Sequence, residues 1–170
     1  SAAAIQGRQA ELRERWLAAL GGFPERRPLN AVTGETVVLK GYSRTKVRFE
    51  SQPGLFVTAL LYRPNTAAFK APHPGLLIPC GHTPEAKAYP NHQRAGLLAA
   101  QAGFVALCYD PVDQGERGQL GGADAPVSVA AHNRIGALAV LLGWNTARFR
   151  IWDGIRGIDY LTSLPDVDAG

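Results

Sequence analysis

The chain has 170 residues, of which 46% are hydrophobic and 19% are charged, a composition typical of a folded domain with a buried core. Its 18 Lys and Arg residues exceed its 14 Asp and Glu residues by a net charge of +4, and this mild excess is spread along the chain. No basic stripe with interleaved aromatic residues occurs, and no apolar stretch approaches the ~20 residues of a membrane span. The composition therefore argues against nucleic acid as a partner and against a membrane span.

The first 35 residues are predicted to form a helix followed by an extended connector. Apolar residues recur at helical spacing over residues 9–20, and Gly21 and Gly22 end the pattern. One face of this helix carries Leu12, Trp16, Leu17 and Leu20.

A period of two replaces the helical pattern from residue 36 onward, where a second unit of the chain is predicted to begin and to extend to residue 170. Val47 and Phe49 alternate with charged residues, and Pro53-Gly54 then favours a turn into a second apolar run over residues 55–62. This pattern predicts an antiparallel hairpin, with residues 36–40 as a further strand beside it.

Strands and helices alternate in the second half of the chain. "GLLIPC" (75–80) and "FVALCYD" (104–110) are short continuous apolar runs, as expected of strands that are buried on both faces. Helices are predicted over about 91–102, within 129–142 and over about 147–163. An apolar stripe marks the last helix and consists of Ile151, Ile155, Ile158 and Leu161.

This alternation predicts right-handed crossovers and a parallel sheet, so the fold class is α/β, with an antiparallel edge leading into a doubly wound layer. Only two buried parallel strands are present, whereas a parallel sheet needs both faces covered and its edges protected. The final turn, "LPDVDAG" (164–170), is expected to lead into another strand, so the architecture looks incomplete.

Two loops follow the predicted buried strands, at the sheet end where catalytic groups gather in open α/β folds. In the first, "CGHTPEAKAYP", Gly81 permits close approach to the backbone, and N–H groups of that bend could face a developing oxyanion. A plain tight turn is the alternative interpretation. His82 directly follows Gly81 and is therefore the histidine best placed for chemistry, whereas His73, between two prolines, is predicted to be exposed.

The second loop, "DPVDQGERGQL", offers Asp110 and Asp113 together with Glu116 and Arg117. Paired carboxylates suit acid–base chemistry or a divalent metal, and a metal-dependent hydrolase would use Asp110, Asp113 and His82. The alternative is a rigid corner in which Arg117 binds one carboxylate with both arms of its guanidinium while Asp110 accepts backbone N–H groups. No histidine or cysteine pair has the spacing of a zinc site, so neither a metal nor a cofactor is expected.

Neither the cysteines nor the serines supply a recognisable nucleophile. Cys80 and Cys108 both end apolar runs, which predicts buried free thiols, and a disulfide is the alternative if the two strands are neighbours. None of the five serines lies in a G-x-S-x-G elbow; they are Ser1, Ser43, Ser51, Ser128 and Ser163.

Residues 36–170 resemble the α/β-hydrolase superfamily, and within it the bacterial acetyl xylan esterase-like and dienelactone hydrolase-like esterases. The resemblance is carried by "LLIPCGHTPEAKAYPNHQRAGLLAAQAGFVALCYDPVDQGERGQL" and by "HNRIGALAVLLGWNTARFRIWDGIRGIDYLTSLPDVD". Its most specific parts are "DPVDQGER" and "IWDGIRGIDYL" with the following turn.

The resemblance implies a serine carboxylic-ester hydrolase of which this chain is the amino-terminal half. The Ser/Asp/His triad would then lie on a missing carboxyl-terminal segment or a second polypeptide, and the substrate would be a small ester such as an acetylated carbohydrate. The oxyanion-hole loop would be Gly81, His82 and Thr83, supported by a loop that contributes Asp110, Asp113, Gln114, Glu116 and Arg117.

The sequence leaves two other functional hypotheses open. One is a truncated hydrolase half without catalysis that acts as a binding or assembly module, and another is a small doubly wound ligand-binding domain. The Ala-rich start, Ser1 to Ala4, lacks the charged and apolar regions of an intact signal peptide. An exported protein whose signal peptide has been removed is favoured, although the compartment is not fixed by these residues.

Overall fold

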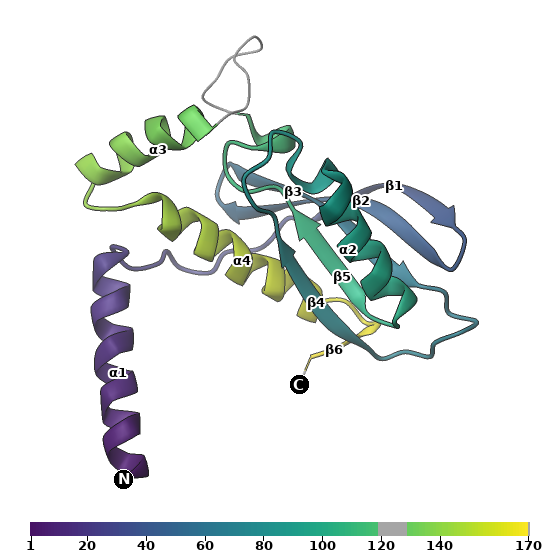
Figure 1. Cartoon of the computed structure of the whole chain (residues 1–170), viewed down its shortest axis with the longest axis horizontal. Helices are drawn as coiled ribbons and strands as arrows, with labels where there is room; N and C mark the ends of the chain where they lie inside the picture. Colours follow the sequence, from purple (N-terminus) through teal and green to yellow (C-terminus); the bar gives the residue numbers. More distant parts are fainter. Residues whose placement is uncertain (119–128, 170) are drawn as a thin grey trace.

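A computed structural model describes residues 1–118 and 129–169, in which six strands form one curled sheet in the order β1-β2-β3-β5-β4-β6 (Figure 1). The strands are β1 (Val32–Leu39), β2 (Tyr42–Gln52), β3 (Leu55–Pro64), β4 (His73–Pro79), β5 (Val105–Tyr109) and β6 (Val167–Asp168). The helices are α1 (Ala2–Ala19), α2 (Pro90–Gln101), α3 (Val129–Leu141) and α4 (Thr146–Thr162), with short 3₁₀ turns η1 (Ala86–Ala88) and η2 (Gly115–Arg117).

The sheet has an antiparallel part and a parallel part, which confirms the predicted α/β fold class. β1, β2 and β3 pair in antiparallel order, and Gly54 forms the turn between β2 and β3 with a φ of +75°. β4 pairs parallel with β5 on one side and with β6 on the other. β6 consists of two residues within the final turn itself, so the strand expected after that turn stays a prediction, and β1 starts at Val32 rather than at residue 36.

Helices cover both faces of the parallel part of the sheet, as in a doubly wound layer (Figure 1). On one face α2 packs Ala99 and Ala100 against β3 and β5. On the other face α4 packs Tyr160 against Phe49 of β2, with ring centroids 5.7 Å apart. This two-sided burial leaves every residue of β5 buried, as predicted for "FVALCYD".

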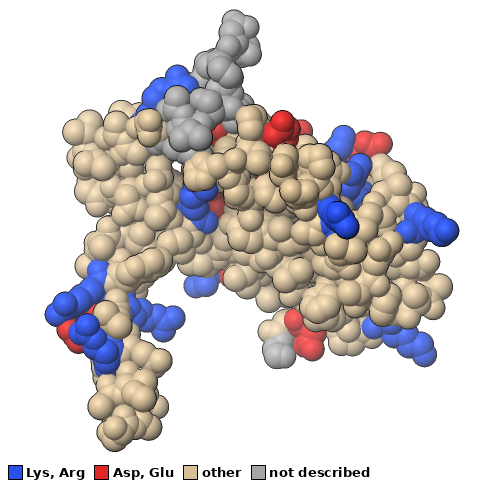
Figure 2. Space-filling model, viewed as in Figure 1, with Lys and Arg blue, Asp and Glu red and all other residues tan. Residues whose placement is uncertain are grey.

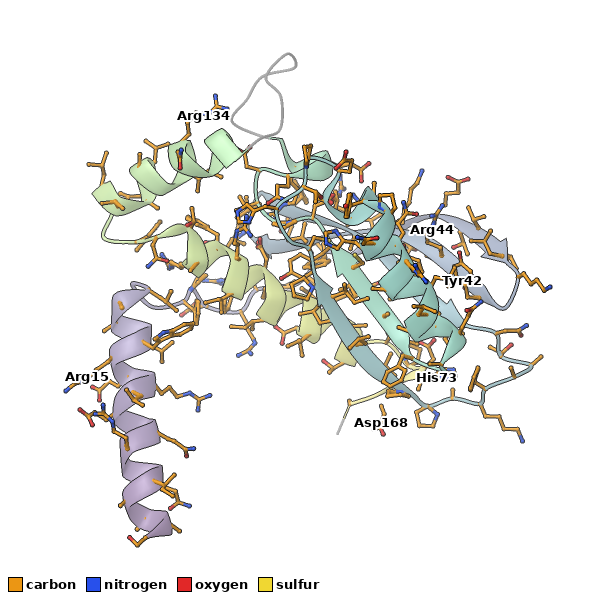
Figure 3. All side chains as sticks on the ribbon, viewed as in Figure 1. Arg15, Tyr42, Arg44, His73, Arg134 and Asp168 are labelled. Atoms are coloured by element: carbon orange, nitrogen blue, oxygen red, sulfur yellow. The ribbon has the colours of Figure 1, made fainter. Side chains whose placement is uncertain are left out.

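The prediction that β4 is buried on both faces is wrong. Leu76 is 39% exposed, and most of the strand is exposed or half-buried. The reason is that β6 pairs only with His73 and Pro74, so among the described residues the rest of β4 has a neighbouring strand on one side alone. His73 was predicted to be exposed and is instead 3% exposed, because it starts β4 beside β6, where Figure 3 labels it near Asp168.

The buried face of α4 also differs from the predicted stripe. Leu161 of that stripe is buried as predicted, whereas Ile158 is 50% exposed and Trp152, which lies outside the stripe, is 4% exposed. Glycines explain the difference, because a Cβ at Gly157 would lie 2.9 Å from Leu77 of β4. The helix therefore packs its small residues closely against the sheet. This orientation places the isoleucines on the flanks of the helix rather than at the centre of its contact with the sheet.

α1 is longer than predicted, and its apolar face is not buried. The helix begins at Ala2 rather than residue 9, and Trp16 is 61% exposed. In Figures 1 and 2 this helix projects from the body of the molecule, so that among its predicted apolar residues only Leu20, at its end, is buried. Among the described residues no helix combines the length and apolar character needed to cross a membrane.

Candidate functional site

The two loops singled out from the sequence leave the sheet next to each other. Pro79, the last residue of β4, is aligned with Tyr109, the last residue of β5, in the parallel register. Because parallel neighbours end at the same edge of a sheet, the segments that follow them meet there. A backbone hydrogen bond joins the two loops directly, since the Gly115 N–H donates to the Pro84 carbonyl at 3.1 Å.

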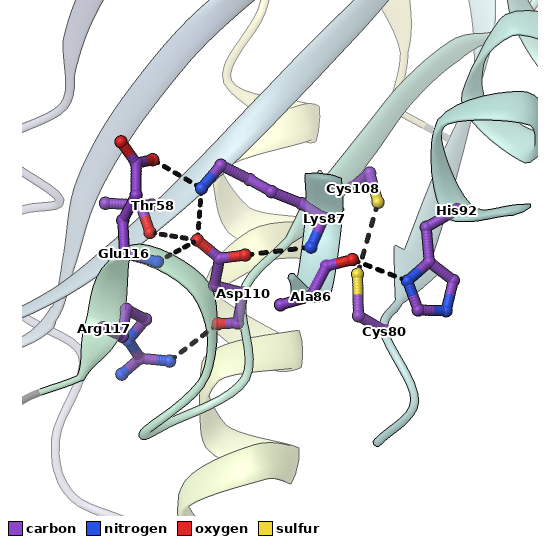
Figure 4. A network of polar contacts seen from close by, with 9 residues as sticks. All are labelled: Thr58, Cys80, Ala86, Lys87, His92, Cys108, Asp110, Glu116 and Arg117. Atoms are coloured by element: carbon purple, nitrogen blue, oxygen red, sulfur yellow. Dashed lines mark hydrogen bonds and ion pairs between the residues drawn. The ribbon is translucent and has the colours of Figure 1, made fainter. Parts of the chain in front are cut away.

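Asp110 is the centre of the junction, and its fully buried carboxylate accepts hydrogen bonds from three other segments (Figure 4). The Thr58 hydroxyl of β3 donates to Oδ2 at 2.7 Å, and the Lys87 backbone N–H of η1 donates to Oδ1 at 3.0 Å. The Glu116 backbone N–H of η2 donates to Oδ2 at 3.2 Å. The expectation that Asp110 binds backbone N–H groups is therefore confirmed.

Lys87 supplies the positive charge that this buried carboxylate requires. Its ammonium contacts Asp110 Oδ2 and lies 2.5 Å from Glu116 Oε2 (Figure 4). The Lys87 side chain is 7% exposed, whereas that of Glu116 is 67% exposed, so the ammonium links a buried carboxylate to one at the surface. Asp110 and Glu116 are therefore both paired with the same ammonium.

Arg117 forms the predicted ion pair with a carboxylate, but its partner lies outside the loop. Nη1 donates to Asp153 Oδ2 of α4 at 2.6 Å, and both side chains are 1% exposed. The same Nη1 donates to the Asp110 carbonyl at 3.0 Å, so the pair ties α4 to the end of β5. The expectation that both arms of the guanidinium bind one carboxylate is wrong, because Nε and Nη2 have no hydrogen-bond partner within residues 1–118 and 129–169.

Backbone conformation also makes the second loop rigid. Asp113 is 2% exposed and has a φ of +63°, a left-handed conformation that Asp tolerates better than most residues. Gly115 has a φ of +57°, and a Cβ there would lie 2.4 Å from Asp110 Oδ1. Only glycine therefore fits where the loop turns over the buried carboxylate. The last letters of the quoted loop, Gln119 and Leu120, lie outside the described residues.

The first loop contains the candidate oxyanion residues Gly81, His82 and Thr83, of which the first two are exposed and the third is half-buried. The Gly81 N–H points to Nε2 of His92 at 3.4 Å, and the Thr83 N–H donates to the Gly81 carbonyl at 3.1 Å. His92 Nδ1 lies 2.7 Å from the Ala86 carbonyl and must therefore carry the proton, which leaves Nε2 as the acceptor for Gly81.

Gln114 lies between the two loops and is 2% exposed. Its amide Nε2 donates to the carbonyls of Gly81 and Thr83, and its Oε1 accepts from Arg150 of α4. Burial lowers the pKa of the Arg150 guanidinium, and burial together with the nearby Asp153 charge raises the pKa of Tyr109 to about 12. The first loop, which is exposed at Gly81 and His82, therefore contacts a buried layer of polar and charged side chains.

Cys80, which begins the first loop, and Cys108 of β5 are free, buried thiols, which confirms the first interpretation of them. Their sulfurs are 3.4 Å apart. The hydrogen bond to Cys108, followed by burial, raises the pKa of the Cys80 thiol. A thiol with a raised pKa is a poor nucleophile, so Cys80 is a poor candidate for an attacking group.

The described residues form no metal-binding cluster, and the groove beside the two loops is lined by charges of both signs. Among residues 1–118 and 129–169, no three His, Cys, Asp or Glu side chains are grouped so that they could hold a metal ion. A groove of about 700 Å³ lies beside Lys87 and Glu116 and reaches β1 and β2. Its charged lining contains three acidic and three basic residues: Glu35, Glu85, Glu116, Arg44, Lys46 and Lys87.

Solved structures with the same arrangement were found, whereas a scan of family models and a search of curated proteins gave no match. A candidate acetyl xylan esterase from Bacteroides fragilis superposes with a TM-score of 0.73 at 18% identity, covering 94% of this chain and 43% of that one. Acetyl Xylan Esterase 1 from Thermoanaerobacterium sp. JW/SL YS485 gives a TM-score of 0.63 at 21% identity, covering 92% and 47%. A glucuronoyl esterase from Solibacter usitatus gives 0.56 at 20% identity, covering 90% and 47%.

These likenesses establish the fold, since each covers most of this chain at low sequence identity. The chain has the architecture of half of an α/β-hydrolase, as the resemblance in its sequence implied. It spans less than half the length of each of these three solved chains.

Proposed function

We propose that the chain is the part of a serine carboxylic-ester hydrolase that supplies the oxyanion side of the active site, and that the nucleophile is on another polypeptide segment. The observation that carries the proposal is the first loop, which leaves the carboxyl end of β4 in a fold shared with acetyl xylan and glucuronoyl esterases. The support comes from fold and loop position, since the identities are low.

The backbone N–H of His82 is the proposed oxyanion donor. The carbonyl of the preceding residue, Gly81, accepts from Gln114 at 2.8 Å, so across the trans peptide the His82 N–H points away from Gln114. In ester hydrolysis a serine hydroxyl attacks the carbonyl carbon while a histidine takes its proton, and the carbonyl oxygen becomes negative. One aligned N–H donor to that oxygen lowers the barrier by ~3 kcal/mol.

The free edge of β4 supports the assignment of the nucleophile to a further segment. From Gly75 to Pro79 this strand is paired only with β5 among the described residues. A strand continuing the direction of β6 along this edge would end beside Gly81, because β6 runs parallel to β4. Within the chain, the hydroxyls of Ser51 and Ser163 donate to backbone carbonyls instead. The proposed substrate is a small ester, with acetylated carbohydrate as the first class to assay.

A fluorophosphonate reagent, which bonds covalently to the activated serine of serine hydrolases, tests the location of the nucleophile. The reagent is applied to a native preparation that cleaves p-nitrophenyl acetate and to residues 1–170 alone, and labelled peptides are identified by mass spectrometry. We expect label on a serine outside residues 1–170 and no ester hydrolysis by residues 1–170 alone. Label on Ser43, Ser51 or Ser163 with activity of the chain alone contradicts the proposal.

Two substitutions at one position test the oxyanion role. His82→Pro removes the backbone N–H, so kcat in the active preparation should fall ~100-fold or more. His82→Ala is the matched control, because it keeps the N–H and removes only an exposed side chain. It should retain activity within about 3-fold. Equal losses in the two variants would assign the effect to the imidazole and refute the backbone role.

A further inference from the structure

The side chain of Gln114 connects the second loop to the first loop and to α4. Its side-chain amide donates to two carbonyls of the first loop, that of Gly81 at 2.8 Å and that of Thr83 at 2.9 Å. Its own Oε1 accepts a hydrogen bond from Arg150 Nη2 at 2.9 Å. Both ends of a 2%-exposed amide are thereby used, and the side chain is held from α4 while it holds the loop.

These bonds determine where one particular N–H points. The peptide bond between Gly81 and His82 is trans, so the His82 N–H points away from the Gly81 carbonyl in the same plane. Because that carbonyl faces Gln114, the His82 N–H faces the opposite way, out of the junction. The bond to Thr83 fixes the other end of the bend, where Pro84 follows and brings no N–H of its own.

We propose that Gln114 is a positioning residue, which sets the direction of the His82 N–H toward the reacting carbonyl oxygen; the inference rests on the proposed function. Arg150 aligns the amide, the amide aligns the Gly81 peptide, and that peptide presents its N–H to the oxyanion. Loss of the clamp allows the peptide to rotate, and an N–H that is not already aligned stabilises the transition state less. Substrate binding itself does not require this alignment.

Gln114→Glu is the sharpest test, since glutamate keeps the length of the side chain and its acceptor for Arg150. It lacks the N–H donors and places an oxygen against two carbonyl oxygens. In the ester-hydrolysing preparation we expect kcat to fall 10-fold or more with KM within about 2-fold, because a donor that acts only in the transition state appears in kcat. Gln114→Asn, which keeps a shorter amide, should lose less than Gln114→Glu.

Gln93 offers a matched control on the first turn of α2. Its Nε2 donates to the Ala88 carbonyl at 2.7 Å and its Oε1 accepts from Arg44 at 2.7 Å, a similar bonding pattern that does not involve Gly81 or Thr83. Gln93→Glu should change kcat less than 2-fold. A loss of kcat at Gln93 equal to that at Gln114, or a Gln114→Glu variant with wild-type kcat, overturns the inference.

A second measurement is independent of catalysis and uses residues 1–170 alone. The ¹⁵N order parameter of the His82 amide should be near 0.8 in the wild type and fall below about 0.6 in Gln114→Glu, as a held peptide becomes mobile. An unchanged order parameter refutes the clamp whether or not the protein is an esterase. Conversely, absence of ester hydrolysis in every wild-type preparation refutes the proposed function while the order parameter still decides the clamp.

Discussion

The ion pair between Arg117 and Asp153 permits a quantitative test of how the second loop is held. The two side chains are each 1% exposed, their closest atoms are 2.6 Å apart, and Arg150 also lies within the electrostatic range of Asp153. Asp153→Ala therefore leaves a buried guanidinium without its carboxylate and beside a second cation. Breaking a buried pair from one side costs about 3–5 kcal/mol.

At about 2–4 °C per kcal/mol for a chain of this size, the melting temperature should fall by on the order of 10 °C. Urea unfolding followed by tryptophan fluorescence measures the free energy of unfolding and reveals any change in the m-value. Glu35→Ala is the control, because its pair with Lys46 is 3.1 Å long with side chains 64% and 65% exposed. That variant should cost less than ~1 kcal/mol.

A double substitution separates the pair from the packing around it. Arg117→Leu with Asp153→Leu removes both charges together, so it should recover most of the stability lost in Asp153→Ala. Asp153→Asn, which keeps the shape of the side chain, provides a folded variant if Asp153→Ala does not fold. A cost below 1 kcal/mol for Asp153→Ala and Asp153→Asn, or a double variant no more stable than either single one, refutes the reasoning.

Two further predictions concern the loop turn and the start of β6. Gly115→Ala combines a left-handed φ with a Cβ 2.4 Å from Asp110, so it should cost at least 2 kcal/mol in urea unfolding. Gly54→Ala, with a φ of +75° and nothing within 4 Å of its Cβ, should cost only about 1 kcal/mol, and equal costs would exclude the contact with Asp110. The Arg63 hydrogen bond, opposed in part by burial, lowers the pKa of Asp166 below its ordinary value of 3.8. That stabilisation is present above pH 3.8 and is lost as the pH falls through the lowered pKa, so Arg63→Leu should destabilise by ~1 kcal/mol at neutral pH and by nothing in strong acid; a cost independent of pH contradicts it.

The sequence predicted the order of the elements because local patterns set it. Alternation in "TKVRFE" and the Pro53-Gly54 turn determine the hairpin, and the continuous apolar run "FVALCY" determines a strand buried on both faces. The same patterns failed where burial depends on a distant neighbour. Leu76 belongs to a run as apolar as that of β5, yet it is 39% exposed because β6 pairs with only the first residues of β4.

The location of the candidate site could be predicted from the sequence, whereas most of the contacts between its side chains could not. The carboxyl ends of β4 and β5 follow from the parallel register, so Gly81 and Asp110 could be expected together. Lys87 was missed although it is the only cation in "CGHTPEAKAYP", since a loop lysine is ordinarily solvated. Asp153 gave a clearer signal, a lone carboxylate among Trp152 and two glycines on the helix face that meets the sheet.

At the carboxyl ends of β4 and β5, some of the candidate site residues are buried and others are exposed. Asp110, Lys87 and Arg117 are buried, and the two ion pairs among the described residues, Lys87 with Asp110 and Arg117 with Asp153, tie the second loop to η1 and to α4. Gly81 and His82 are exposed at the same edge, next to the part of β4 that pairs only with β5 among the described residues. A rigid, buried support under an exposed backbone donor is what preorganised stabilisation of an oxyanion requires, because the donor must be aligned before the charge develops. Under the proposed function, the reacting group would come from a separate segment without any rearrangement of the donor.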